Sequence, residues 1–241
     1  MLNMYLALDF ANYEKTKSFI EENDLVGVPV KVGMELFYHE GTRIINYLKE
    51  NNHSVFLDLK LFDIPTTVEK AMRNLAKYEV DFVNVHALGG SEMIKRATEG
   101  LQSSSQSAHK TNLLAVTILT SMDDQVIYDD LGLSGTVNEE VVRLAKIAEK
   151  SGANGVVCSV HEANLIKSTC EANFKTMTPG IRMSESQSND QKRIATPTYA
   201  KQNGSDYIVI GRSVTASDKP KEAYDKALGE WKNDTTLPNC T

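Results

Sequence analysis

Short runs of apolar and β-branched residues recur along the whole chain, and stretches with helical periodicity lie between them. Helical spacing links Ile44 with Leu48, for example. Another helix is predicted to begin near Asn138, just ahead of the acidic pair Glu139 and Glu140. The apolar runs have the length and composition of strands. Eight such runs cover residues 4–10, 28–33, 54–61, 81–88, 112–119, 155–160, 174–181 and 207–211.

Alternation of strands with helices predicts a parallel sheet, because each parallel crossover needs a long connection. The 241 residues contain one strand-like run in roughly every 30 positions, which is the size of a strand plus a helix. An α/β fold of the (β/α)8 TIM barrel type therefore fits better than an open sheet. Leu57, Leu59 and Leu61 are expected to face the helices. We expect a single domain over residues 1–241, with a short polar C-terminal tail after about residue 232.

Composition narrows the class of protein further. Lys and Arg total 26 against 32 Asp and Glu, so the net charge is −6, which argues against binding to nucleic acid or an anionic membrane. No apolar run approaches the ~20 residues that span a bilayer, and the first residues lack the pattern of a signal peptide. Cys158, Cys170 and Cys240 are widely spaced and form no metal or redox motif. A cytoplasmic protein is expected.

Charged side chains interrupt three of the strand-like runs near their ends. Asp58 and Lys60 are two positions apart and share the inward face of one strand, and Lys31 stands on the strand before it. Asp9 ends the first strand, and Asp63 follows in a loop. Buried charges are costly unless they pair. The spacing therefore predicts either a structural ion-pair cluster that closes one barrel end or an active site at the carboxyl ends of the strands.

The last two strands run into loops suited to phosphate, which barrel enzymes often bind at this place. The seventh continues through Pro179 and Gly180 to Arg182, and the eighth through Gly211 to Arg212. Glycine lets backbone N–H groups approach a phosphate, and arginine offers a planar fork of donors. The alternatives are a plain turn at Gly211 and a surface ion pair at Arg212.

No histidine is expected to take part in a catalytic step. His86 shares an inward strand face with Asn84 and is interpreted as a core histidine that supports the site. The remaining histidines fall at loop-like or helix-start positions and are predicted to be solvated: His39, His53, His109 and His161.

The string Asp58-x-Lys60-x-x-Asp63-Ile64-Pro65, with Lys31 one strand earlier, resembles orotidine 5′-monophosphate decarboxylases of the bacterial type. Thr66 departs from this pattern, since bacterial members often carry Asn there. Further matching strings follow in the same order along nearly the whole chain. They are Leu6-Ala7-Leu8-Asp9, Lys31-Val32-Gly33, Val83-Asn84-Val85-His86-Ala87, Val116-Thr117-Ile118-Leu119-Thr120-Ser121, Thr178-Pro179-Gly180-Ile181-Arg182, Asp190-Gln191-Lys192-Arg193 and Ile210-Gly211-Arg212.

The resemblance implies removal of CO2 from orotidine 5′-monophosphate to give uridine 5′-monophosphate in de novo pyrimidine biosynthesis, with no metal and no organic cofactor. It implies a catalytic array of Lys31, Asp58, Lys60 and Asp63, in which Lys60 donates the proton to C6. It further implies a homodimer in which Asp63 and Thr67 reach into the partner's site.

The resemblance also assigns substrate contacts. Asp9 and Lys31 match positions that contact the ribose hydroxyls, and Thr120 and Ser121 match positions near the ribose and pyrimidine. The residues matched to the phosphate end of the substrate are Pro179, Arg182, Gln191, Gly211 and Arg212.

Two rival functions remain open from the sequence. One is a sugar-phosphate decarboxylase or aldolase barrel that uses a related acidic motif with Mg²⁺; Lys31 and the sequence Ile64 to Thr67 favour the pyrimidine enzyme. The other is a barrel that has lost catalysis and only binds nucleotides or a partner protein. The four charged residues of the array are all present, which argues against that loss.

Overall fold

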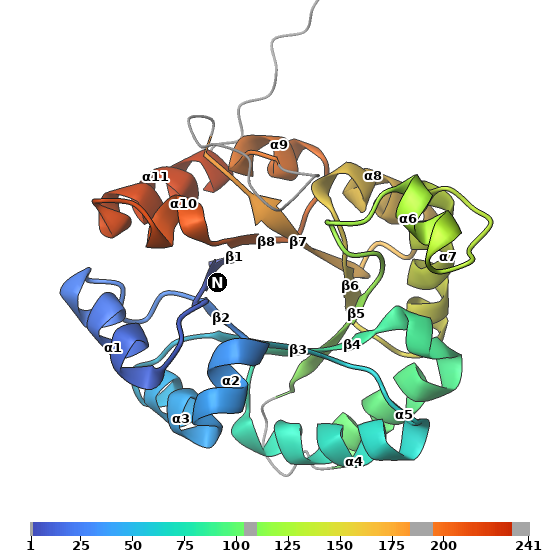
Figure 1. The fold of residues 1–241 in the computed structure, drawn as a ribbon, viewed down its shortest axis with the longest axis horizontal. Coiled ribbons are helices and arrows are strands. Elements are labelled where there is room, and N and C mark those ends of the chain that lie inside the picture. The colour runs from blue at the N-terminus through green and yellow to red at the C-terminus, as the bar shows by residue number, and fades with distance from the viewer. Residues whose placement is uncertain (1, 104–109, 184–194, 233–241) are drawn as a thin grey trace, which may run out of the picture.

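The computed structural model describes residues 2–103, 110–183 and 195–232. Within these ranges eight parallel strands pair in chain order and close into a barrel, with helices around the outside (Figure 1). The prediction of a (β/α)8 barrel is confirmed. The strands are β1 (Met4–Ala7), β2 (Val30–Gly33), β3 (Val55–Leu61), β4 (Phe82–His86), β5 (Asn112–Val116), β6 (Gly155–Val157), β7 (Lys175–Ile181) and β8 (Tyr207–Ile210). The helices are α1 (Tyr13–Glu22), α2 (Met34–Glu40), α3 (Thr42–Glu50), α4 (Pro65–Leu75), α5 (Gly90–Ser103), α6 (Asp124–Asp129), α7 (Val137–Lys150), α8 (Val160–Thr169), α9 (Pro197–Gln202), α10 (Arg212–Thr215) and α11 (Pro220–Lys232).

Several strands end before the apolar runs that predicted them. β1 stops at Ala7 although the run continues to Phe10, and β5 stops at Val116 although its run continues to Leu119. At the carboxyl ends of barrel strands the chain leaves the sheet to form the loops of the mouth. Ile118 and Leu119, beyond β5, line the mouth. Leu8, beyond β1, is buried in the outer core, and its backbone N–H still donates to the carbonyl oxygen of Lys31 at 2.9 Å.

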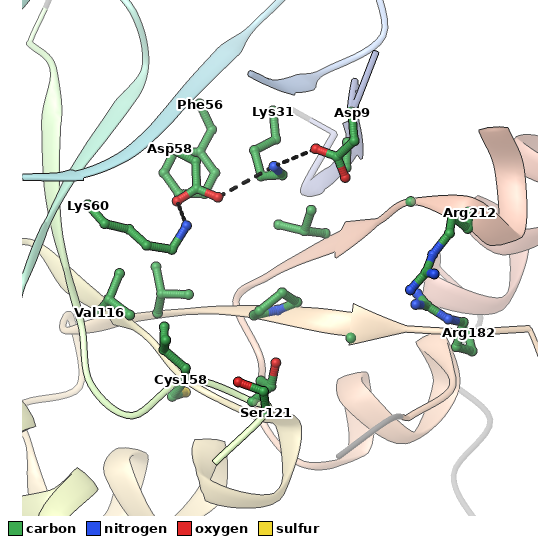
Figure 2. A pocket seen from close by; sticks show the side chains of 18 of the residues that line it. Asp9, Lys31, Phe56, Asp58, Lys60, Val116, Ser121, Cys158, Arg182 and Arg212 are labelled. Atoms are coloured by element: carbon green, nitrogen blue, oxygen red, sulfur yellow. Dashed lines mark hydrogen bonds and ion pairs between the residues drawn. The ribbon is translucent and has the colours of Figure 1, made fainter. Parts of the chain in front are cut away.

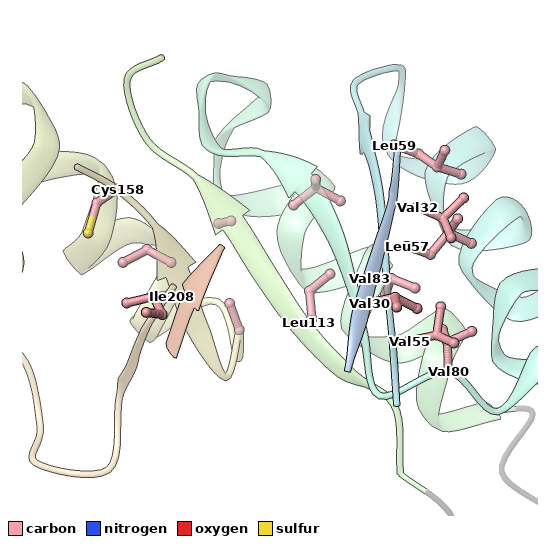
Figure 3. Close-up of a cluster of buried hydrophobic side chains, with 14 of the residues drawn as sticks. Val30, Val32, Val55, Leu57, Leu59, Val80, Val83, Leu113, Cys158 and Ile208 are labelled. Carbon is pink, nitrogen blue, oxygen red and sulfur yellow. The ribbon is translucent and has the colours of Figure 1, made fainter. Parts of the chain in front are cut away.

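An outer layer of aliphatic side chains joins the strands to the helices (Figure 3). Val30, Val32, Leu57 and Leu59 are all buried in this layer, and Leu61 is half-buried against it. The predicted outward face of the third strand is thus confirmed. A parallel sheet covered on both faces needs apolar residues on both, which explains why these strands read as nearly continuous apolar runs.

Aromatic rings fill the barrel interior below the mouth. Tyr5, Phe56, Phe82 and Tyr207 contact one another edge-on, with the Tyr5 and Phe82 ring centroids 5.8 Å apart. Such edge-to-face pairs add to the stability gained from burial alone. This packed layer makes the barrel a solid support for the residues above it.

Replacing Tyr5 with Phe should stabilise the protein. The Tyr5 hydroxyl is fully buried and finds no hydrogen-bond partner in the described part of the chain, so folding strips it of water without compensation. Removing it should raise the free energy of unfolding by about 1 kcal/mol, measured by urea denaturation. Tyr47→Phe is the matched control, because the Tyr47 hydroxyl donates to Glu21 at 3.3 Å and its loss should give no gain. A destabilised Tyr5→Phe variant would contradict the prediction.

The prediction that His53 is solvated is wrong. Its side chain is only 2% exposed and lies between the turns that precede β2 and β3. Nδ1 lies 2.7 Å from the carbonyl oxygen of Val28, and Nε2 accepts the backbone N–H of Gly27 at 3.4 Å. Because a carbonyl only accepts, the proton sits on Nδ1 of a neutral ring. Burial lowers the pKa of His53, which keeps the ring neutral.

The helix predicted to begin near Asn138 begins one residue earlier. Thr136 is its cap: the Thr136 hydroxyl accepts the backbone N–H of Glu139, and the Glu139 carboxylate accepts that of Thr136. This capping box satisfies two backbone donors, so the acidic residue itself defines the start of the helix.

Two further expectations concern the C-terminal tail and the crossing of a membrane. The polar tail after about residue 232 lies outside the described residues, so the expected domain bounds stay a prediction. Among the helices that the structure does describe, none combines the length and the apolar character needed to cross a bilayer.

Candidate active site

A cavity of about 510 Å³ opens at the carboxyl ends of the strands. Its walls come from both halves of the chain, because the barrel brings the ends of β1, β2, β3, β5, β6, β7 and β8 together. The predicted site residues that line it are Asp9, Lys31, Asp58, Lys60, Thr120, Ser121, Pro179, Arg182, Gly211 and Arg212. Most of the positions singled out in the sequence thus meet in one pocket.

Four of these residues form a row of alternating charge along one wall (Figure 2). The Lys31 ammonium lies 3.2 Å from the Asp9 carboxylate and 3.4 Å from Asp58 Oδ2. The Lys60 ammonium lies 2.6 Å from Asp58 Oδ1. The side chains of Lys31 and Asp58 are only 12% and 13% exposed, so solvent screens their ion pair weakly.

The row keeps its central groups charged. Burial by itself would raise the pKa of the Asp58 carboxyl, but the ammonium groups of Lys31 and Lys60 outweigh it, and the pKa lies below its ordinary value. Burial would likewise lower the pKa of Lys31, but Asp58 and Asp9 hold it above its ordinary value. Lys31 and Asp58 are therefore ionised at neutral pH and present fixed charges to the pocket.

Asn84, on β4, joins this row from the neighbouring strand, and the sequence assigned it no role. Its side chain is 1% exposed, and its Nδ2 donates to Asp58 Oδ1 at 2.7 Å. Its Oδ1 accepts the backbone N–H of Lys60, also at 2.7 Å. The available signal was a polar residue at an inward position of an otherwise apolar strand.

Two arginines stand on the side of the pocket away from Lys60, with their guanidinium groups close together (Figure 2). Arg182 is 7% exposed, and its Nη1 donates to the carbonyl oxygen of Ile181 at 2.9 Å. Arg212 follows Gly211 at the start of α10 and is exposed. Gly180, in the irregular end of β7, carries a φ of +83°, a conformation that an L side chain rarely adopts, so this position before Arg182 requires glycine.

An apolar wall completes the cavity, and the sequence did not assign its residues to the site. Phe56, Val116, Val157 and Cys158 line it from three strands. Cys158 is 1% exposed, so it belongs to the hydrophobic core as well as to the pocket wall. Low-polarity walls beside fixed charges strengthen electrostatic interactions inside the pocket.

Two of the predicted site residues lie elsewhere. Asp63 and Thr67 are exposed beyond the end of β3 and do not line the pocket of their own chain. The Asp63 carboxylate accepts the backbone N–H of Ile64 at 2.6 Å. Gln191 falls outside the described residues.

His86 does not line the pocket, although it is near the row. Its ring stacks on Phe62 with centroids 5.9 Å apart, and its Nδ1 accepts the backbone N–H of Leu88 at 3.4 Å. Burial, and then the nearby Lys60 charge, lower the pKa of His86. These contacts keep the ring neutral and packed beside the end of β4.

A (β/α)8 barrel with a partly buried row of charges at the carboxyl ends of its strands belongs to the class of barrel enzymes that carry out their chemistry at that end. Within that class, residues 2–227 match the model of the orotidine 5′-phosphate decarboxylase / HUMPS family. The chain belongs to this family.

Similar proteins cover nearly the full chain. A protein of Bacillus pumilus named orotidine 5′-phosphate decarboxylase is 48% identical over 228 residues, which are 94% of this chain and 97% of that protein. One of the same name from a Geobacillus species is 46% identical over 95% of this chain and 96% of its own length. The crystal structure of orotidine 5′-phosphate decarboxylase from Lactobacillus acidophilus superposes with a TM-score of 0.85 at 39% identity, covering 97% of this chain and all of that one. The expected resemblance and the expectation of a carboxy-lyase are confirmed.

Proposed function

We propose that this protein removes CO2 from orotidine 5′-monophosphate to give uridine 5′-monophosphate. The observation that carries the proposal is the row Asp9, Lys31, Asp58 and Lys60, which stands in a pocket with Arg182 and Arg212 on the other side. The names of relatives that match over nearly their full length support the same reaction. The reaction would complete de novo synthesis of uridine 5′-monophosphate in the cytoplasm.

The charges of the pocket suit this substrate. Lys31, Lys60, Arg182 and Arg212 place four cationic groups on its lining, whereas Asp9 and Asp58 place two carboxylates there. Orotidine 5′-monophosphate carries a phosphate at one end and a carboxylate on the pyrimidine ring at the other. The paired arginines match the phosphate as a fork of donors, and the lysines match the charge that develops on the ring.

Decarboxylation breaks the bond between C6 and the carboxylate carbon and leaves the electron pair on C6. The pyrimidine offers no adjacent electron sink for that pair, so the protein must stabilise the developing charge with fixed groups. The Lys60 ammonium, held by Asp58 at 2.6 Å, would stabilise it and then give C6 the proton that replaces CO2. Lys60, left neutral, regains a proton from water.

Repulsion between Asp58 and the substrate carboxylate contributes less than this stabilisation. Two unit charges ~4 Å apart interact by about 4 kcal/mol at an effective dielectric constant of 20. Enzymes lower barriers by roughly 8–23 kcal/mol, so repulsion alone does not account for catalysis. The main role of Asp58 is to orient Lys60 and keep it charged.

Asp9 and Lys31 are proposed to contact the ribose, and Thr120 and Ser121 the ribose and pyrimidine.

The position of Lys31 also bears on the choice between the pyrimidine decarboxylase and the Mg²⁺-dependent sugar-phosphate enzyme. Its ammonium fills the space between the carboxylates of Asp9 and Asp58, with contacts of 3.2 and 3.4 Å. A barrel that holds Mg²⁺ would need such carboxylates for the metal. The structure thus favours the pyrimidine enzyme over its Mg²⁺-dependent rival.

The proposed active form is a homodimer whose sites are completed in trans. Asp63 and Thr67 are exposed and lie outside their own pocket. Phe62 and Ile64, on either side of Asp63, are 62% and 64% exposed, which is unusual for large apolar side chains beside a pocket. A second copy that covers this segment would bury the apolar residues and receive Asp63 in its own site.

The function is tested by incubating the purified protein with orotidine 5′-monophosphate in the presence of EDTA. We expect CO2 release and the fall in ultraviolet absorbance that accompanies loss of the substrate. Turnover that requires added Mg²⁺, and that proceeds with a sugar phosphate, would support the rival decarboxylase. Binding of the nucleotide without turnover would support the non-catalytic barrel.

Replacing Arg212 with Ala should weaken binding at the phosphate end. Loss of a charge-assisted pair of hydrogen bonds costs about 3 kcal/mol, so KM for orotidine 5′-monophosphate should rise about 100-fold. Binding of the unphosphorylated nucleoside, measured by calorimetry, should change little. Arg43→Ala is the control, since Arg43 pairs with Glu14 at 2.8 Å on the outer surface. Equal losses for nucleotide and nucleoside would contradict the phosphate assignment.

A further inference from the structure

The strand that carries Lys60 is irregular where it meets β4. Leu57 pairs with Val83, and Leu61 pairs with Val85, so four steps along β3 correspond to two along β4. The ladder is interrupted between these pairs, as in a β-bulge. Lys60 lies in this interruption with a φ of +51°, in the left-handed region that a residue with a side chain seldom occupies. Such a conformation costs of order 1–3 kcal/mol and persists only where the surroundings hold it.

Asn84 lies on β4 between the two paired residues and supplies what the interrupted ladder lacks. Its Oδ1 accepts the backbone N–H of Lys60 at 2.7 Å, in place of a strand carbonyl. Its Nδ2 donates to Asp58 Oδ1 at 2.7 Å. A backbone N–H only donates and a carboxylate only accepts, so these two partners admit a single orientation of the amide.

The contacts form a closed ring of interactions. Asn84 holds the Lys60 backbone with one end of its amide and Asp58 with the other, and Asp58 Oδ1 also accepts the Lys60 ammonium at 2.6 Å. The Asn84 side chain is 1% exposed, so water does not compete for its partners. One amide therefore holds both the Lys60 backbone, from which the side chain extends, and the Asp58 carboxylate, which the Lys60 ammonium contacts.

We propose that Asn84 is a positioning residue for decarboxylation, which fixes the left-handed turn at Lys60 and the carboxylate of Asp58 so that the ammonium points at the reacting carbon. The inference rests on the proposed function for its catalytic part. Asn84 lies behind the charged row and touches no substrate in this assignment. It acts through Lys60 and Asp58.

Truncation of the amide tests the proposal. Asn84→Ala frees both partners, and a misplacement of about 1 Å at a reacting group costs ~100-fold in rate, so kcat should fall by about that factor while KM stays within a few-fold. Asn112→Ala is the matched control, because Asn112 begins β5 at the far end of the barrel and its Nδ2 donates to the carbonyl oxygen of Asp81 at 3.1 Å. That variant should retain the wild-type kcat.

A second variant separates positioning from a loss of packing. Asn84→Asp keeps the size of the side chain but places a carboxylate beside Asp58, where the N–H donor is lost. Protonation of the new carboxyl restores one donor and one acceptor. Asn84 itself contacts Asp58 and Lys60. The next titratable groups are Lys31, which pairs with Asp58, and His86, which lies near Lys60 and two residues along β4. The kcat of Asn84→Asp relative to wild type should rise as the pH falls, whereas the ratio for Asn84→Ala should stay flat.

Exchange of the Lys60 backbone amide with D2O, followed by NMR, gives a readout that needs no substrate. The wild-type amide should be protected, and Asn84→Ala should exchange it at least about tenfold faster, as expected when a buried hydrogen bond is lost. Unchanged kcat and unchanged exchange in a folded Asn84→Ala variant would overturn the positioning role. Failure of the wild-type protein to convert orotidine 5′-monophosphate would overturn the proposed function instead, and the exchange result would still decide whether Asn84 holds Lys60.

Discussion

Replacing Lys60 with Ala should reduce kcat/KM for orotidine 5′-monophosphate by about 10⁴-fold or more. In the proposed mechanism the variant loses both the cation that stabilises charge on C6 and the proton donor, and each such role is worth at least ~100-fold. In that mechanism it also leaves Asp58 near the substrate carboxylate without the ammonium that lies 2.6 Å away in the wild-type protein. Steady-state turnover, followed by the fall in substrate absorbance, measures the loss.

Two controls separate chemistry from folding in this experiment. Lys49→Ala removes another lysine, whose ammonium donates to the carbonyl oxygen of Glu79 at 2.7 Å on the outer surface, and it should leave kcat/KM unchanged. Binding of uridine 5′-monophosphate to Lys60→Ala should persist, because Arg182 and Arg212 remain. Substantial decarboxylation by a folded Lys60→Ala variant would remove Lys60 from its proposed role.

The barrel was predictable because its periodicity lies in the sequence itself. Parallel strands buried on both faces appear as short apolar runs, and helices covering them show apolar residues at helical spacing. The outward Leu57 and Leu59 follow directly from a two-residue period. The same period placed Asp58 and Lys60 on one face, and in the structure their side chains meet at 2.6 Å.

The interactions that organise the site were less accessible, because they depend on pairing between strands. The sequence next to Lys60 does not indicate a left-handed backbone, since its neighbours Leu59 and Leu61 continue the strand pattern. The bulge is visible only once β3 is aligned with β4. That alignment also shows that Asn84 is the partner of both Asp58 and Lys60. His53 escaped for the same reason, because its partners precede another strand.

A mixture of two inactive variants should regain activity if sites are shared between subunits. Asp63→Ala removes the residue proposed to enter the partner's site, and Lys60→Ala disables the site of its own chain. In a heterodimer, the Asp63→Ala chain keeps Lys60 and receives an intact Asp63 from its partner. One site is then complete, and a purified heterodimer should show about half the activity of a wild-type dimer, since a two-fold dimer has two equivalent sites.

The matched control for this mixture is Asp58→Ala with Lys60→Ala. Asp58 and Lys60 meet within one chain at 2.6 Å, so each site of that heterodimer lacks one of them and should stay inactive. Differently tagged chains, co-purified and assayed at a fixed dimer concentration, allow the comparison. Recovery with Asp63→Ala but not with Asp58→Ala would place Asp63 in the neighbouring site, because only a residue that crosses between subunits can complement in this way. Lack of activity in both heterodimers would mean that Asp63 acts in the site of its own chain. The exposure of Phe62 and Ile64 would then need another explanation.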